Sequence, residues 1–147
     1  MCVIKNKTIL VTGGAGFVGS YVLEQLLEED VKKIIVIDNF VRGSRKNIET
    51  SLASGKVRLI EGDICNRDFI TPLFKDVDYC FHLAGLADIV PSINNPSLYF
   101  QHNVTGTLKL IESLKLNTQL KKLKLDDCNA NCKFCNLPLD KLSNPTT

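Results

Sequence analysis

The sequence predicts an α/β fold, in which a doubly wound parallel sheet lies between two layers of helices. Three observations lead to this prediction. Short apolar segments alternate with helical patterns, a glycine-rich turn follows the first apolar segment, and an aspartate ends the second. Strands that are buried on both faces and joined through helices are typical of a parallel sheet with right-handed crossovers. We therefore expect a Rossmann-like sheet with the strand order 3-2-1-4-5.

The predicted strands are β-rich and mostly apolar. They cover residues 9–11, 34–37, 57–60 and 77–83, and a fifth is expected at 120–125. Helical patterns lie between them, and the first begins directly after the glycine-rich turn. In this helix Val18, Val22 and Leu26 recur every fourth residue, with Leu23 and Leu27 beside them, so one apolar face is expected to pack on the sheet.

The later helices have recognisable starting residues. Two more polar helices are expected at 44–53 and 66–75. Asn95 followed by Pro96 is typical of a cap and a first-turn proline, and Val104, Leu108 and Ile111 carry that helix onward.

Composition limits the classes of protein that fit. The chain has 147 residues, 44% hydrophobic and 23% charged, as expected of one globular domain. A net charge of +2 gives no reason to expect a nucleic-acid or membrane partner. The longest aliphatic run, 34–37, is too short to span a bilayer, and the start lacks the pattern of a signal peptide. We therefore expect a cytoplasmic protein whose cysteines are thiols or metal ligands.

The segment 14–19, GAGFVG, matches the pattern G-x-G-x-x-G between the first strand and the first helix. Gly13, Gly16 and Gly19 also match G-x-x-G-x-x-G. Such glycines allow a tight turn, close approach of the backbone to a pyrophosphate, and close packing of the helix on the strand. The helix N-terminus then offers free N–H groups to phosphates. The alternative is a turn that only joins a strand to a helix.

Asp38 ends the second strand, nineteen residues after Gly19. A carboxylate at this place accepts hydrogen bonds from the adenosine ribose and repels a 2′-phosphate, so the sequence favours NAD over NADP. The basic side chains of Arg42, Arg45 and Lys46 would weaken that preference. The alternative is that Asp38 only opens a turn with Asn39.

Residues 7 to about 115 resemble the N-terminal part of an extended short-chain dehydrogenase/reductase of the NAD-dependent sugar-nucleotide epimerase/dehydratase family. The stretches that carry the resemblance are VTGGAGFVGS, IDNFVRGSRKNI, EGDI, FHLAG and PSINNPSLYFQHNVTGT. Two of them, DNFVRG and LADIVPSINNP, are most similar to UDP-glucose 4-epimerase-type members. The resemblance implies a UDP-sugar substrate in the parent family and, often, a homodimer.

The resemblance also implies roles for individual residues. The residues that would hold the NAD pyrophosphate are Gly13, Gly16, Phe17 and Val18. The adenosine ribose would lie on Asp38 and Asn39, the adenine on Asp63 and Ile64, and the nicotinamide on Leu83 and Ala84. Ala87 stands where these epimerases often have a lysine, and Ser92 is either in the sugar-facing loop or at a helix start.

Catalysis in this family uses the tyrosine of a Tyr-x-x-x-Lys pair as the base. The three tyrosines of this chain, Tyr21, Tyr79 and Tyr99, are followed four residues later by Gln, Leu and Asn. His82 and His102 are expected to be structural, and Cys80 a small buried hydrophobe. No catalytic residue is therefore assigned, and whether the chain is an enzyme stays open.

Cys128, Cys132 and Cys135 form C-x3-C-x2-C, with Phe134 before the last cysteine. This stretch resembles the start of a radical S-adenosylmethionine enzyme, whose three thiolates hold a [4Fe–4S] cluster. Only twelve residues follow Cys135, so the alternative is a labile, oxidisable tail.

We therefore expect an NAD-binding domain over residues 1–118, with the fifth strand extending it to 126, and an incomplete tail over 119–147. Three hypotheses follow. The chain is the NAD-binding portion of a sugar-nucleotide epimerase/dehydratase, truncated and catalytically incomplete; it is an NAD-binding or sensing module without catalysis; or it is a truncated fusion with a radical S-adenosylmethionine enzyme.

Overall fold

The computed structural model describes residues 4–117 and 122–125, and within them a five-stranded parallel sheet has the order β3-β2-β1-β4-β5. This confirms the predicted fold class and strand order. The strands are β1 (Thr8–Thr12), β2 (Lys33–Asp38), β3 (Val57–Glu61), β4 (Tyr79–His82) and β5 (Lys122–Leu125).

The register places the most apolar segments at the centre of the sheet. All five residues of β1 are buried, and Leu10 pairs with Ile35 of β2 and with Cys80 of β4. β5 pairs with the outer side of β4, Cys80 opposite Leu123. Because β1 has a partner on each side and a helical layer on each face, its three central residues are all apolar rather than alternating.

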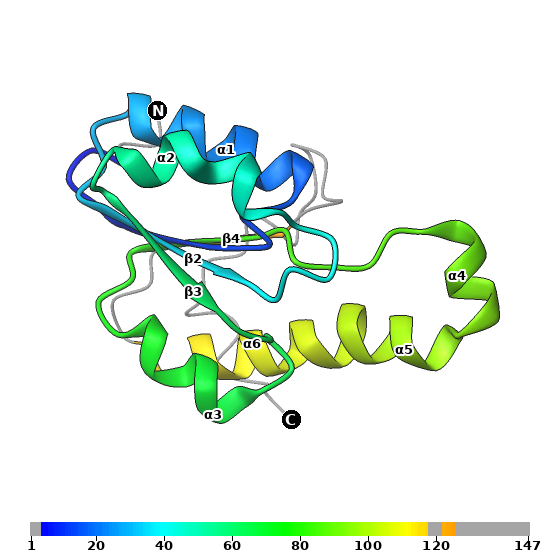
Figure 1. Cartoon of the computed structure of the whole chain (residues 1–147). Coiled ribbons are helices and arrows are strands. Elements are labelled where there is room, and N and C mark those ends of the chain that lie inside the picture. Colours follow the sequence, from blue (N-terminus) through cyan, green and yellow to red (C-terminus); the bar gives the residue numbers. More distant parts are fainter. Residues whose placement is uncertain (1–3, 118–121, 126–147) are drawn as a thin grey trace.

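The helices form two layers, one on each face of the sheet (Figure 1). One layer contains α1 (Phe17–Glu28) and α2 (Glu49–Ala53), which follows the 3-10 turn η1 (Arg45–Ile48). The opposite layer contains α3 (Arg67–Ile70), the 3-10 turn η2 (Thr71–Phe74) and α6 (Thr107–Leu114). The side chains of Ser44 and Asn66 cap the second and third helical segments, as the predicted helix starts require.

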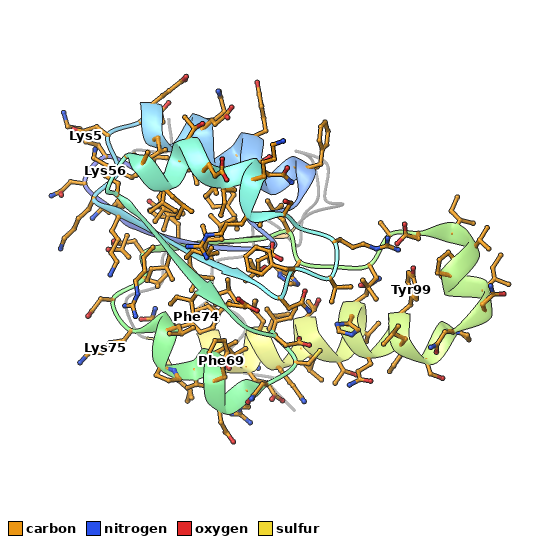
Figure 2. The ribbon with its side chains drawn as sticks, viewed as in Figure 1. Lys5, Lys56, Phe69, Phe74, Lys75 and Tyr99 are labelled. Carbon is orange, nitrogen blue, oxygen red and sulfur yellow. The ribbon has the colours of Figure 1, made fainter. Side chains whose placement is uncertain are left out.

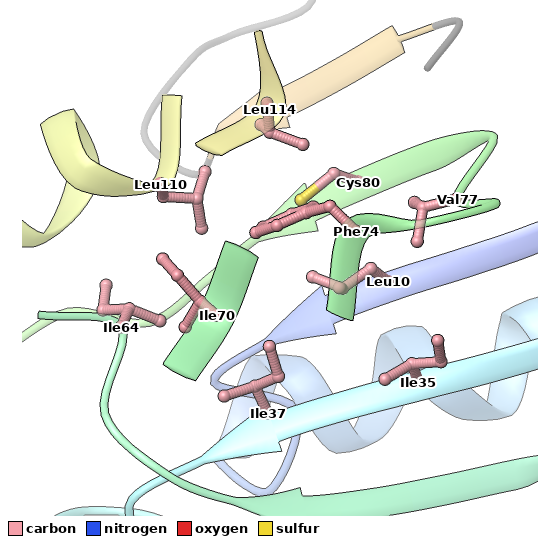
Figure 3. Packing of buried hydrophobic residues seen from close by; sticks show 10 residues of the cluster. All are labelled: Leu10, Ile35, Ile37, Ile64, Ile70, Phe74, Val77, Cys80, Leu110 and Leu114. Atoms are coloured by element: carbon pink, nitrogen blue, oxygen red, sulfur yellow. The ribbon is translucent and has the colours of Figure 1, made fainter. Parts of the chain in front are cut away.

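Each helical layer has its own hydrophobic core against the sheet. Figure 3 shows the core on the α3 and α6 side, where Phe74 and Ile70 pack with Leu110 and Leu114 against strand residues. On the α1 side, Leu23 and Leu26 pack against Ile9, Val11 and Val36. In Figure 2, Phe69 and Phe74 lie on the α3 side.

The structure corrects the predicted faces of two helices. In α1 the buried residues are Gly19, Leu23 and Leu26, whereas Val18 is 49% exposed. The fourfold spacing that begins at Val18 drifts around the helix, and Gly19, which lacks a side chain, is the true first contact. Beyond Asn95, likewise, Val104 and Leu108 are exposed, and Leu110 and Leu114 face the core.

A helical arm projects beyond the sheet, and only its part after Asn95 was predicted from the sequence. It contains α4 (Ile89–Asn94), α5 (Pro96–Phe100) and the π-helix η3 (Gln101–Gly106), which runs into α6 (Figure 1). Asn95 caps α5, as predicted. Several large apolar side chains of the arm are exposed: Ile89, Val90, Ile93, Leu98, Phe100 and Val104.

Among the helices that the structure describes, none has the length and apolarity needed to cross a bilayer. The opposite end of the sheet carries surface ion pairs, where Lys5 and Lys56, both labelled in Figure 2, each pair with Asp30. These pairs hold the pKa of Asp30 below its usual value, chiefly through the hydrogen bond from Lys56.

Candidate functional site

A cavity opens at the carboxyl ends of the parallel strands. It contains about 570 Å³ of empty space, including its mouth. Residues directly after β1, β2, β3 and β4 all contribute to it, as expected at the switch point of a doubly wound sheet. Its lining consists of Gly13, Gly16, Ile37, Asp38, Asn39, Arg42, Gly43, Gly62, Asp63, Ile64, Leu83, Ala84, Gly85, Leu86 and His102.

Eight of the ten predicted cofactor residues line this one cavity, although they come from four separate segments. The eight are Gly13, Gly16, Asp38, Asn39, Asp63, Ile64, Leu83 and Ala84. The other two, Phe17 and Val18, open α1 beside Gly16 and expose 91% and 49% of their surface. Their side chains lie outside the lining, so any part they play in binding an anion falls to their backbone N–H groups.

The glycine turn packs more tightly than side chains would allow. Gly13 has φ +70°, and a Cβ there would lie 2.6 Å from the backbone nitrogen of Ala84. At Gly19 a Cβ would lie 2.2 Å from the carbonyl oxygen of Gly13. Gly16 differs: its backbone is extended, and a Cβ there would meet only the Gly13 oxygen, at 3.2 Å. The turn therefore needs Gly13 and Gly19 to fold, but Gly16 mainly leaves the cavity open.

Asp38 is 7% exposed and is held by two backbone hydrogen bonds. Its Oδ2 accepts from the Ala15 N–H at 2.9 Å, and its Oδ1 accepts from the Phe40 N–H at 2.9 Å. Because a carboxylate has about four acceptor sites, two such bonds leave acceptor capacity on a group whose direction is fixed. The predicted turn role and the predicted ribose role are thus compatible.

Ala15 joins the glycine turn to the loop after β2. Besides donating to Asp38, it accepts at its carbonyl oxygen from the Ser44 N–H at 3.0 Å and from Asn47 Nδ2 at 2.9 Å. Gly43 lies at the same contact, where there is no room for a side chain, since a Cβ there would lie 2.8 Å from Asp38 Oδ1. Gly43 and Asn47 were not predicted from the sequence, because their role depends on a contact between segments about thirty residues apart.

The basic residues near Asp38 are not equivalent. Arg42 lines the cavity, and its guanidinium forms an ion pair with Asp88, which also accepts from the Tyr99 hydroxyl at 3.3 Å. Arg45 and Lys46 lie outside the lining, in η1. The positive charge that would attract a 2′-phosphate is therefore already partnered at Arg42.

The far side of the cavity combines a polar and an apolar wall. Asp63 Oδ1 accepts from the Cys65 N–H at 2.8 Å, and Ile64 is 6% exposed within the core. Across the cavity, the Leu83 and Ala84 N–H groups donate to Thr12, at its carbonyl oxygen (3.0 Å) and its Oγ1 (3.3 Å). A planar ring bound here would contact aliphatic side chains, and the Asp63 carboxylate would lie at the edge of that apolar surface.

The histidines and cysteines take different roles. His82 is 5% exposed and bridges Thr12 Oγ1 (2.6 Å) and Thr107 Oγ1 (2.9 Å), which confirms it as a packed, hydrogen-bonded residue. Cys80 is 1% exposed, and burial raises the pKa of its thiol, as expected of a small hydrophobe. His102, expected to be structural only, lines the cavity and lies near Cys65.

Burial, followed by the neighbouring Asp63 charge, raises the pKa of the Cys65 thiol to about 11. Cys65 lies close to Asp63 and His102, with one donor atom of each residue within 4.8 Å of the others. Asn103 fixes the loop after β4 by exchanging two 2.8 Å hydrogen bonds with the backbone of Leu86. The predicted metal ligands Cys128, Cys132 and Cys135 lie outside the described residues.

Comparison with known proteins gives a consistent result. Residues 9–127 match the family model described as the NAD dependent epimerase/dehydratase family, so the match extends through β5 and ends before Cys128. A UDP-glucose 4-epimerase of Haemophilus influenzae is 36% identical over 111 residues, which are 73% of this chain and 32% of that enzyme. A CDP-paratose 2-epimerase of Salmonella typhi is 38% identical over 110 residues, 73% of this chain and 32% of that enzyme.

Solved structures agree with the sequence comparison. The Bordetella bronchiseptica enzyme WbmF in complex with NAD⁺ superposes with a TM-score of 0.77 at 35% identity, covering 83% of this chain and 36% of that one. The chain thus spans about a third of the length of these relatives.

Proposed function

Since this chain belongs to the NAD-dependent epimerase/dehydratase family, we propose that it binds NAD in the cavity at the carboxyl ends of its strands. The observation that carries the proposal is Asp38, a buried carboxylate that two backbone N–H groups aim at a cavity bordered by the glycine turn. That WbmF was solved with NAD⁺ supports it.

The residues present fit each part of the dinucleotide. At Gly16 the backbone has no side chain between the cavity and the start of α1, where N–H groups can receive a pyrophosphate. Asp38 and Asn39 offer acceptors to ribose hydroxyls, and Asp63 with Ile64 offers a polar rim and an aliphatic surface to adenine. Leu83 and Ala84 provide the corresponding surface for nicotinamide.

The same geometry favours NAD over NADP. A 2′-phosphate would lie against the Asp38 carboxylate, and like charges in a partly buried place repel strongly. Arg42, the cation on the lining, already pairs with Asp88, so recruiting it to a phosphate would break that pair. Arg45 and Lys46 are exposed, which weakens their effect on a ligand in the cavity.

Bound NAD supplies a hydride acceptor for the carbinol carbon of a sugar, and the two relatives named above act on nucleotide sugars of different kinds, as their names state. We propose that this chain also belongs to nucleotide-sugar metabolism. The family's tyrosine base would need a lysine four residues later, and the 147 residues contain no such pair. We therefore propose cofactor binding, without turnover, for these 147 residues on their own.

Calorimetric titration tests the proposal. The pure chain should bind NAD with one site and at least tenfold more tightly than NADP. Asp38→Asn should reduce that ratio, because it removes the repelling charge while the side-chain oxygen keeps one backbone bond.

Asp68→Asn provides the matched control, since it removes an exposed carboxylate of α3 outside the cavity. It should leave both affinities unchanged. Equal affinity of the unmodified chain for NAD and NADP would contradict the proposed role of Asp38. An affinity ratio that Asp38→Asn leaves unchanged would contradict it as well. No heat with either dinucleotide would refute NAD binding itself.

A further inference from the structure

We propose that Asp63, Cys65 and His102 form a binding site for a zinc-class divalent metal ion at the edge of the cavity. These residues come from two segments, the turn after β3 and the π-helix η3. Each offers one donor atom, and the three donor atoms all lie within 4.8 Å of one another. All three residues are partly exposed, so an ion can reach them from solvent.

The distance between two of the donor atoms is close to what such an ion requires. Zinc lies about 2.3 Å from a thiolate sulfur and about 2.1 Å from an imidazole nitrogen, so at a tetrahedral angle those two donors stand about 3.6 Å apart. In the structure Cys65 Sγ and His102 Nδ1 are 3.9 Å apart. Small side-chain rotations are therefore enough to bring the cysteine sulfur and the histidine nitrogen to one ion. Zinc accepts an imidazole, a carboxylate and a thiolate as ligands, and on binding the metal Cys65 would release its thiol proton to solvent.

Local structure holds the three donors in place. The Cys65 N–H donates to Asp63 Oδ1 at 2.8 Å, which fixes the carboxylate beside the thiol. The Cys65 Sγ lies 3.6 Å from the Gln101 carbonyl oxygen. Gly106 leaves room for the sulfur, since a Cβ there would lie 3.2 Å from it. The π-helix turns His102 towards the cavity, and such segments are frequent at functional sites.

Three protein ligands leave a fourth position open. Asp63 and His102 both line the cavity, so that position faces the space assigned to adenine. This consequence rests on the proposed NAD function: a bound ion engages the Asp63 carboxylate and obstructs the adenine end. The metal and NAD should therefore compete.

The test uses Co²⁺, because a thiolate bonded to Co²⁺ gives an intense charge-transfer absorption that oxygen and nitrogen ligands do not. The background is the full chain with Cys2, Cys128, Cys132 and Cys135 changed to serine, which leaves Cys65 and the buried Cys80. One equivalent of Co²⁺ should produce the band, and equimolar Zn²⁺ should displace it.

Single variants in that background identify the ligands. Cys65→Ser should abolish the band, and Asp63→Asn and His102→Gln should each weaken Co²⁺ binding tenfold or more. Asp68→Asn should change nothing. Thermal unfolding of each variant without metal checks that it still folds. A missing band, or a band that survives Cys65→Ser, would overturn the site.

A separate titration measures competition. Saturating Zn²⁺ should weaken NAD binding in the background chain at least tenfold, and Cys65→Ser should remove that effect. If NAD fails to bind at all while the Co²⁺ band behaves as expected, the metal site stands and the NAD proposal falls. If NAD binds equally well with and without Zn²⁺ while the band is present, the competition is refuted.

Discussion

At the scale of single residues, Gly16 and Gly19 belong to one turn but have different surroundings. A Cβ at Gly19 would lie 2.2 Å from the Gly13 carbonyl oxygen, a backbone atom that cannot move away alone. At Gly16 the nearest atom would be 3.2 Å away, and the backbone is extended, so other residues adopt it readily. The sequence pattern assigns these glycines to one motif and does not show that their structural roles differ.

This difference predicts opposite outcomes for two substitutions. Gly16→Val should weaken NAD binding at least a hundredfold, because its side chain enters the cavity, and it should cost less stability than Gly19→Ala. Gly19→Ala should lower the free energy of unfolding by about 3 kcal/mol or more, since overpacking against backbone cannot relax easily. Calorimetry and urea unfolding measure the two effects. Equal loss of stability in both variants would contradict the distinction.

His82 forms a second residue-scale feature, a chain of hydrogen bonds between β1, β4 and α6. The Thr107 hydroxyl donates to the Asn103 carbonyl oxygen at 2.6 Å, so towards His82 Nε2 it accepts. Nε2 of the imidazole therefore carries a proton, and Nδ1 lies 2.6 Å from the Thr12 hydroxyl. The strand-end position of His82 predicts burial but not this proton arrangement.

Replacing His82 by alanine removes the shared partner of two threonine hydroxyls. We expect a loss of about 1–3 kcal/mol in the free energy of unfolding, from unsatisfied polar groups in a buried place. Urea unfolding measures it. Surface substitutions usually change the free energy of unfolding by less than about 0.5 kcal/mol. A loss this small for His82→Ala would show that these hydrogen bonds contribute nothing to stability.

At the scale of elements, periodicity predicts where helices and strands lie better than which faces they bury. Strands β1 to β3 match within a residue or two at each end, because continuous apolar runs leave few alternatives. The face of α1 was misassigned at Val18, since glycine carries no hydrophobic signal and yet makes the closest contact. The π-helix was not predicted, because nothing in local spacing distinguishes it from an α-helix.

The π-helix makes a testable link to the loop after β4. Asn103 Oδ1 accepts from the Leu86 N–H at 2.8 Å. Asn103→Ala should therefore speed hydrogen exchange of the Leu86 amide by roughly fivefold, the equivalent of one hydrogen bond of about 1 kcal/mol. The Leu83 amide, which donates to the Thr12 carbonyl oxygen, serves as the internal control and should not change. Unchanged exchange at Leu86 would contradict the link.

At the scale of the whole molecule, the fold brings together lining residues that the sequence separates by up to 89 positions, from Gly13 to His102. Local motifs predicted eight of the lining residues, because family resemblance places each at a strand end. Gly62 and Gly85 lie within the quoted stretches EGDI and FHLAG but were not assigned a role, whereas the part that Gly43 and Leu86 play in the cavity depends on how loops meet. His102 was missed because a histidine inside a helical pattern usually has only a packing role.

Turnover of a nucleotide sugar is one whole-molecule prediction. The 147-residue chain with added NAD should not interconvert UDP-glucose and UDP-galactose, because no tyrosine has a lysine four residues later. General-base catalysis is typically worth about 10²–10⁴-fold. A coupled assay measures the rate. Turnover well above the rate without enzyme, lost in Asp38→Ala, would contradict the assignment.

Self-association of the chain is a second prediction at the scale of the whole molecule. The arm formed by α4, α5 and η3 exposes Ile89, Val90 and Ile93 by 65–77%, and large exposed apolar patches favour association. We expect concentration-dependent dimers in sedimentation experiments, in keeping with the homodimers implied by family resemblance. Ile93→Lys should shift the population towards monomers, and an unchanged distribution would argue against this surface.

An NMR titration of the ¹⁵N-labelled chain with NAD tests directly whether the cofactor binds in the cavity. The largest amide shifts should fall on residues 13–19, 38–43, 62–64 and 83–86, which surround the cavity. NADP should produce smaller shifts at the same concentration, and Asp38→Asn should bring the two ligands closer. Shifts concentrated elsewhere, for example around Thr71 and Asn117 at the opposite end of the sheet, or none at all, would contradict NAD binding at this site.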